Sequence, residues 1–267
     1  TLVAMSFLLL PLLPNRTVDP WQAINPYLIW LLAIMLALIS FGGYVAVKFF
    51  GEKRGVLMMA IAGGLASSTA VTLSFARLTR EHPLSARLLS AGVLVSGMVM
   101  YVRVVIVASA FNPALALPLG LPMVAAGLAT AAGAAVLLFG AKDTETPKLE
   151  IRNPLELGSA LKLAGLIVII MLAAKLLKAQ AGDAGVIGLA ALSGIADVDA
   201  ITLSMAKSAG GDISLKLASL AILTAVYVNT AAKSVLAWME GGQGIGARVS
   251  LVNALAIGSG LAAAYWV

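Results

Sequence analysis

The sequence has no cysteine and a single histidine, His82, among its 267 residues. Disulfides, iron–sulfur clusters and thiolate metal sites are therefore excluded, and zinc bound by Cys and His in the usual way is not expected. The sequence also lacks a phosphate-binding loop, a catalytic triad, a zinc-protease motif and any visible pairing of a nucleophile with a base. We therefore expect neither an enzyme nor a bound cofactor.

Charge is scarce as well. Charged residues make up 11% of the chain and apolar residues 61%, against about 25% and 45–50% in soluble domains. Uncharged stretches at residues 27–47, 55–76 and 104–141 exceed the ~20 residues that a membrane helix needs. We expect an all-α integral membrane protein whose main partner is the lipid bilayer. We attribute its net charge of +6 to Lys and Arg at helix ends, not to a nucleic-acid surface.

One phrase occurs twice. Residues 64–77 return 130 positions later as residues 194–207, with seven of fourteen positions identical and four conservative. The three positions that differ are consecutive: Ser67-Ser68-Thr69 in the first copy and Asp197-Val198-Asp199 in the second. A duplicated membrane segment that changes only its most polar triplet indicates a paired binding element.

The surroundings of the two copies also match, which predicts two internal repeats. We divide the chain into the end of a preceding helix with a loop (1–26), repeat 1 (27–139), a polar linker (140–154) and repeat 2 (155–267). The predicted helices are 27–50, 55–80, 84–110 and 113–139 in repeat 1, and 155–178, 184–208, 213–238 and 244–267 in repeat 2.

The orientation of the repeats depends on segments 55–80 and 184–208. If each enters the membrane and returns, each repeat has three spanning helices and one broken or re-entrant helix, and repeat 2 is inverted. Nine Lys and Arg residues then lie on one side and five on the other, as the positive-inside rule requires. If each crosses fully, the repeats are parallel. We favour inversion.

Segment 55–80 carries glycines and short hydroxyl side chains within an apolar run. Ser67, Ser68, Thr69 and Thr72 follow Gly63-Gly64, and such residues compete with helical hydrogen bonds. A helix broken at mid-depth is tolerated where it faces protein or a cavity, which marks ion and substrate sites. The alternative is that these small residues let helices pack closely.

Segment 184–208 contains Asp197 and Asp199, the only acidic residues deep within a predicted membrane segment. A carboxylate at mid-bilayer costs at least about 2.5–3.5 kcal/mol, so it needs a partner or a role. On an unwound turn both carboxylates can enter one cavity and, with Thr202 and Ser204 nearby, offer the hard oxygen ligands that Mg²⁺, Ca²⁺ or Mn²⁺ prefers. The alternative is an ion pair with Arg103 or Lys233.

Arg103 and Lys233 occupy matching positions within apolar runs of the two repeats. We expect them to hold the acidic pair or to attract an anion, with Asn229, one turn before Lys233, near Asp199. The alternative is that both side chains snorkel to the membrane surface.

Small residues recur at every fourth position of the last helix in each repeat. They indicate a close-packing face, used within one chain or in a homodimer. The residues are Gly127, Ala131 and Ala135, then Ala254, Gly258 and Ala262.

Three stretches, at residues 25–30, 64–76 and 192–203, resemble the C-terminal membrane domain of unknown function found in MgtC/SapB-type bacterial proteins. The resemblance spans essentially the whole chain, and Asp-Val-Asp-Ala-Ile-Thr at residues 197–202 is its most specific part. It implies a bacterial or archaeal cytoplasmic (inner) membrane and a longer protein whose N-terminal MgtC-like domain is missing here. The magnesium-transport label of these proteins comes from that neighbouring domain.

We therefore expect an ion transporter or channel. The favoured substrate is a small cation, with Mg²⁺ first and proton coupling possible, bound where the two broken helices meet. One alternative is an anion or small-solute pathway that uses Arg103, Lys233 and helix ends. Another is a regulatory membrane subunit that transports nothing.

Overall fold

The computed structural model describes residues 9–18, 25–27, 29–31, 34, 52–139 and 157–266, and within this part the regular structure is helical apart from one isolated bridge between Ala209 and Ile213. The predicted helix 27–50 and linker 140–154 lie wholly or largely outside these residues. The elements are η2 (Leu10–Leu12), α2 (Glu52–Glu81), η4 (Pro83–Ser85), α3 (Ala86–Phe111), η5 (Pro113–Leu115), α4 (Ala116–Phe139), α5 (Leu157–Ala196), α6 (Asp199–Ser208), α7 (Leu215–Gly241) and α8 (Gln243–Ala264).

Five described segments are long and apolar enough to cross a membrane by length and composition, which indicates an integral membrane protein. They are Val56–Glu81, Pro83–Phe111, Pro113–Phe139, Leu215–Gly241 and Gln243–Ala264.

The ends of these helices follow from local chemistry. Pro83 and Pro113 begin short 3₁₀ turns that lead into α3 and α4, positions where a missing N–H costs nothing. Ser214 caps α7 by accepting a hydrogen bond from the Leu217 N–H at 3.2 Å. Gly242, with φ of 74°, separates α7 from α8, as glycine does at helix ends.

Helix α5 contains a sharp turn at Gly182, where φ is 59° and ψ is −144°. The part after Gly182 ends at Ala196, and α6 begins at Asp199. The predicted break in segment 184–208 is thus confirmed, and it falls on Asp197-Val198.

Helix α2 is assigned without interruption, yet it reverses direction. Val56 and Phe75 are nineteen positions apart, which is ~28 Å along a straight helix. A Cβ added to Gly92 of α3 would nevertheless touch both side chains, and both belong to one buried cluster. The first and last parts of α2 therefore lie side by side.

Gly64 and Ser67 locate the reversal. A Cβ on Gly64 would lie 3.1 Å from Ser96 Cα, one turn further along α3 than Gly92, and the Ser67 hydroxyl accepts from Ala70 N–H at 3.3 Å in the manner of a helix cap. The reversal therefore falls within residues 63–69, where the sequence predicted a break in segment 55–80.

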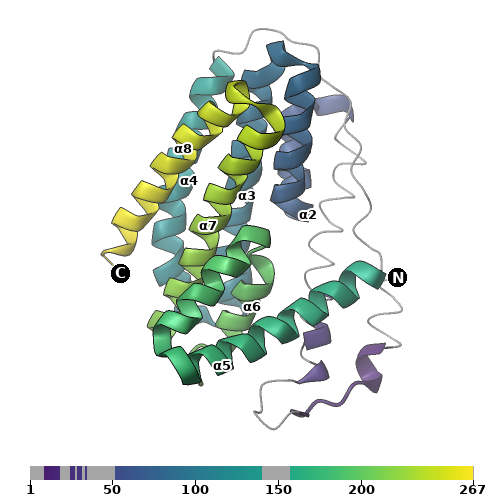
Figure 1. The fold of residues 1–267 in the computed structure, drawn as a ribbon, viewed down its shortest axis with the longest axis vertical. Helices are drawn as coiled ribbons and strands as arrows, with labels where there is room; N and C mark the ends of the chain where they lie inside the picture. The colour runs from purple at the N-terminus through teal and green to yellow at the C-terminus, as the bar shows by residue number, and fades with distance from the viewer. Residues whose placement is uncertain are drawn as a thin grey trace.

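The two reversals approach α3 from opposite ends. Helix α2 ends at Glu81, and a short turn leads directly into the first residue of α3. Beyond α6, the carbonyl of Ala209 accepts from Asn112 Nδ2 at 3.0 Å, at the far end of α3. In Figure 1, α2 accordingly occupies the upper part of the bundle and α6 the lower part, with α7 running along both.

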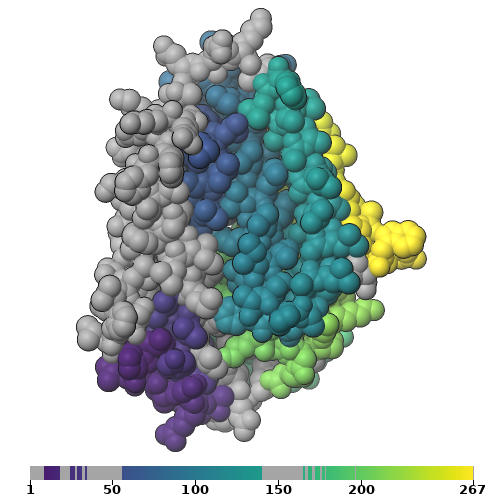
Figure 2. Space-filling model, turned by 180° about the vertical axis from the view of Figure 1, so that it is seen from behind, coloured from purple at the N-terminus to yellow at the C-terminus, as the bar shows by residue number. Residues whose placement is uncertain are grey.

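The outer surface is apolar over α4, whose helix forms a broad face in Figure 2. Leu117, Val124, Leu128 and Val136 are exposed there, as expected for a helix that faces lipid.

For the glycines at 127 and 258, the predicted close-packing face does not serve contacts within one chain. A Cβ at either position would meet nothing within 4 Å, whereas a Cβ on Gly133 of α4 would collide with Val252 of α8. Close packing between these helices therefore uses Gly133, because Gly127 and Gly258 face away from neighbouring atoms. The homodimer remains a prediction.

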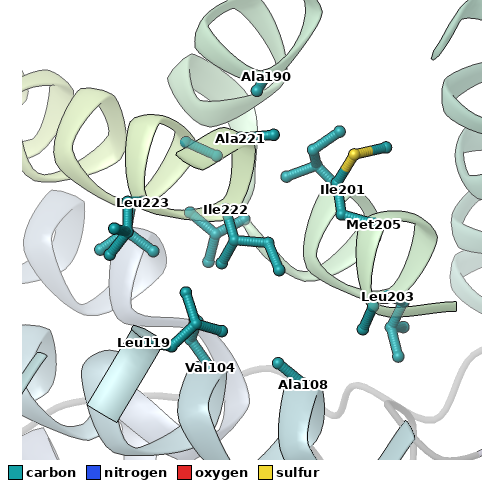
Figure 3. Close-up of a cluster of buried hydrophobic side chains, with 14 of the residues drawn as sticks. Val104, Ala108, Leu119, Ala190, Ile201, Leu203, Met205, Ala221, Ile222 and Leu223 are labelled. Carbon is teal, nitrogen blue, oxygen red and sulfur yellow. The ribbon is translucent and has the colours of Figure 1, made fainter. Parts of the chain in front are cut away.

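Helix α6 lies inside the protein. At 10 residues it is about 15 Å long, too short to cross a bilayer, and all its residues from Ala200 to Ala206 are buried. Figure 3 shows Ile201 and Met205 of α6 beside Ile222 of α7, with Val104 of α3 below. Because seven consecutive residues cover every face of a helix and all are buried, α6 is held by protein and not by lipid.

Candidate functional site

Arg103 and Asp199 form a buried ion pair at the break between α5 and α6. Arg103 Nη2 lies 2.8 Å from Asp199 Oδ2, with side-chain exposures of 5% and 16%. Asp199 is the first residue of α6, where a negative charge also meets the positive end of the helix dipole. The alternative of an ion pair with Arg103 is therefore realised for Asp199, whereas no ion pair of Asp197 is present among the described residues.

Arg103 also binds the reversal of α2. Its Nη1 donates to the carbonyl of Leu65 at 2.8 Å and approaches that of Gly64 at 3.5 Å. One guanidinium on α3 thus joins the turn of α2 to the first residue of α6.

Lys233 is the second buried cation of the cluster. Its Nζ donates to Ser68 Oγ at 2.8 Å and approaches Met100 Sδ at 3.0 Å. Arg103 and Lys233 are 6% and 2% exposed. The snorkelling alternative is wrong, because both long side chains end inside the protein.

The break itself is held by three local contacts. Asp197 Oδ2 accepts from the Asp199 N–H at 3.1 Å and so caps α6. Asn229 Nδ2 on α7 donates to the carbonyl of Gly194 at 2.9 Å, which satisfies a carbonyl near the end of α5. Gly194 is required there because a Cβ would lie 2.8 Å from Ala225 Cα.

The remaining predicted residues lie close by in sequence but differ in role. Thr72 donates to the carbonyl of Ser68 at 2.9 Å, an ordinary helix contact, and Thr69 is half-buried on α2. Thr202 Oγ1 and Ser204 Oγ are buried and have no hydrogen-bond partner in the part of the chain described. Buried hydroxyls without partners are uncommon.

Sequence reasoning missed a neighbouring hydroxyl network. Tyr101 and Thr230 share a hydrogen bond of 3.2 Å between α3 and α7, and Asn253 of α8 donates to the Thr230 carbonyl at 3.1 Å. Met100 was also missed, because a methionine in an apolar run is usually a core residue. The one available signal was position, because Met100 and Tyr101 lie three and two residues before Arg103 on the same helix.

The cluster does not fit a resident divalent metal. Asp199 is engaged by Arg103 and Asp197 by the backbone, and the described residues contain no group of three or more His, Cys, Asp or Glu able to hold a metal ion. Two carboxylates and two basic groups also cancel in formal charge. Ca²⁺ and Mg²⁺ sites instead gather several oxygen ligands with excess negative charge.

Comparison with known proteins gives a family but no activity. The chain is 33% identical over 183 residues to an uncharacterized protein of Aquifex aeolicus, covering 67% of this chain and 79% of that protein. No solved structure matches the chain. Neither the relative nor the family model carries the MgtC/SapB name or a magnesium label. Residues 34–241 match the model of the domain of unknown function DUF4010, and the chain belongs to this family.

Proposed function

We propose that this protein is a transporter of small cations in a bacterial or archaeal cytoplasmic membrane, with Asp199 as the group that binds the ion. The observation that carries the proposal is Arg103, which joins the turn of α2 to Asp199. Charged groups within a membrane are costly and are kept where they bind or move ions.

In this proposal Arg103 competes with the transported cation for the Asp199 carboxylate. A cation that enters between the two helix reversals takes the Asp199 carboxylate, and the guanidinium is displaced toward the carbonyls of Leu65 and Gly64, to which it already bonds. When the cation leaves, the ion pair forms again. An empty site therefore never holds an uncompensated carboxylate, which would cost several kcal/mol.

We also propose that the two halves are inverted repeats that provide alternating access. Arg103 in the first half reaches Asp199 in the second, and Lys233, its counterpart 130 positions later, reaches Ser68 in the first. The two contacts are similar but not identical, because the counterpart of Ser68 is Val198, the residue before Asp199.

Contacts between the helix ends also support the proposal of inverted repeats. Asn112, after α3, bonds to the carbonyl of Ala209, after α6. Correspondingly, Arg80 near the end of α2 bonds to the carbonyl of Met239 near the end of α7, at 2.6 Å. The ends of α2 and α6 lie at opposite ends of α3, which is what one re-entrant unit from each side of the membrane requires.

Monovalent cations suit the site better than Mg²⁺. The cluster is formally neutral, so an entering charge of +1 is easier to balance than +2, and Mg²⁺ sheds its waters reluctantly. Mg²⁺ therefore becomes a comparison ion in the experiment.

An anion pathway is a second candidate. In the described part of the chain, Lys233 Nζ bonds to a hydroxyl and a thioether and not to a carboxylate. A buried ammonium held by neutral atoms is able to attract an anion. A reversal potential set by chloride would favour this candidate over the first.

Flux into proteoliposomes tests the proposal, with Na⁺, K⁺, Li⁺ and Mg²⁺ supplied separately across a pH gradient. We expect uptake of at least one cation, lost in Asp199→Asn and kept in Asp183→Asn, where the carboxylate is exposed. Equal uptake by Asp199→Asn and the unaltered protein rejects the site. The absence of flux for every ion points to the regulatory-subunit alternative.

A further inference from the structure

Lys233 and Arg103 differ in the charge of the groups to which they are bonded. Arg103 is paired with a carboxylate, whereas Ser68 and Met100, the described partners of Lys233, are neutral. A hydroxyl oxygen accepts a hydrogen bond and also donates one, and a thioether sulfur is a weak acceptor. The contact between Lys233 and Ser68 therefore survives in either protonation state of the amine.

The other charged groups at the site are held by contacts in which each group takes part in its charged form. Arg103, which faces the cluster from α3, does not deprotonate in proteins. Asp197 and Asp199, at the break between α5 and α6, carry their charges in hydrogen bonds to a backbone N–H and to Arg103. The remaining neighbours in the described part of the chain, Ser68 on α2, Met100 on α3 and Asn229 on α7, do not ionise near neutral pH.

We infer that Lys233 is the coupling group, which releases one proton for each monovalent cation that the site takes up. The inference rests on the proposed cation transport. As the cation joins Asp199, an N–H bond of the Lys233 ammonium breaks and its proton passes to water on the side to which the site is open. The amine keeps the electron pair, and the site remains formally neutral. Reprotonation of Lys233 accompanies release of the cation.

Lys233→Arg separates coupling from transport. Arginine keeps the positive charge but retains its proton. In the unaltered protein we expect one proton to leave the proteoliposome per monovalent cation entering, with uptake insensitive to membrane potential. In Lys233→Arg we expect uptake without proton exit and accelerated by an inside-negative potential. Lys216→Arg, an exposed substitution on the same helix, is the control and should match the unaltered protein.

A second measurement does not require transport. Na⁺, K⁺ or Li⁺ is added to detergent-solubilised protein in weakly buffered solution, and the released protons are counted. We expect about one proton per chain from the unaltered protein and from Lys216→Arg, and none from Lys233→Arg or Asp199→Asn. Gel filtration confirms that each variant is folded.

The outcomes distinguish the two proposals. If Lys233→Arg still exchanges or releases protons like the unaltered protein, Lys233 is not the coupling group, while cation transport at Asp199 stands. If the unaltered protein moves no cation and releases no proton, both the proposed function and the inference fail.

Discussion

Arg103 Nη2 lies 2.8 Å from Asp199 Oδ2 although the two residues are 96 positions apart in the sequence. Asp199 replaces a threonine of the first copy of the repeated phrase, Thr69, and Arg103 belongs to the half that contains that threonine. The chemical difference between the two copies therefore supplies one of the contacts that join the two parts of the chain. Helix packing needs no such ion pair, since small residues and hydroxyls suffice for it.

The ion pair predicts an unequal response to single and double substitution. Arg103→Ala leaves the Asp199 carboxylate buried without a partner and should lower the free energy of unfolding by about 3–5 kcal/mol. Adding Asp199→Ala removes that charge and should recover much of the loss. Thermal unfolding in detergent measures both. A double variant no more stable than the single one would contradict the prediction.

The exposed pair between Arg77 and Glu240 provides the comparison. Its atoms are 3.0 Å apart, but the side chains are 62% and 32% exposed. Arg77→Ala should change the unfolding temperature little, because exposed ion pairs contribute little to stability.

The contents of the site could be predicted because charge is rare in this sequence. With few ionisable residues in the apolar segments, Asp197, Asp199, Arg103 and Lys233 had few possible partners other than one another. Their specific pairing was not predictable. It depends on the direction in which each long side chain points. Either cation could have bonded to the turn of α2 or to the break between α5 and α6.

The fold was predictable to a similar extent. The predicted ranges of α3, α4, α7 and α8 agree with the structure to within a few residues, and Pro83, Pro113 and Gly242 set these boundaries through local geometry. Helix α2 was harder, because its glycines and short hydroxyl residues suit either a break or close helix packing. The contact of both Val56 and Phe75 with Gly92 is a tertiary fact that no local pattern encodes.

Gly92 provides a test of that reversal. Gly92→Ala should cost about 1–3 kcal/mol of stability, the usual range for overpacking a core, because the new methyl group meets Phe75 and Val56. Gly97→Ala, on the same helix with nothing within 4 Å of its added Cβ, is the control. If α2 reverses, Val56→Ala should relieve part of the cost of Gly92→Ala in a double-mutant cycle. Strict additivity would indicate that Val56 lies elsewhere.

Ser68 predicts how firmly Lys233 keeps its proton. Ser68→Asp places a carboxylate where the structure has a hydroxyl 2.8 Å from Nζ, and the new ion pair should fix the ammonium. Cation uptake should then fall about tenfold or more, the effect of one interaction worth ~1.4 kcal/mol. In Ser68→Asn, whose new side chain is polar but uncharged, cation uptake should fall less. Initial uptake rates in proteoliposomes decide between them, and equal rates for the two variants would argue against a mobile Lys233 proton.

The membrane topology gives the most direct test of the inverted arrangement. Position 82 follows α2 and position 212 follows α6, and both residues are exposed. Because α2 and α6 end at opposite ends of α3, single cysteines at 82 and 212 should react with a membrane-impermeant maleimide from opposite sides. The chain lacks cysteine, so each label reports one position. Cysteine at 244, at the start of α8, is the control and should label from the side of 82, since Gly244 lies near Ala86. Labelling of 82 and 212 from the same side would exclude inversion, and with it alternating access through two equivalent re-entrant units.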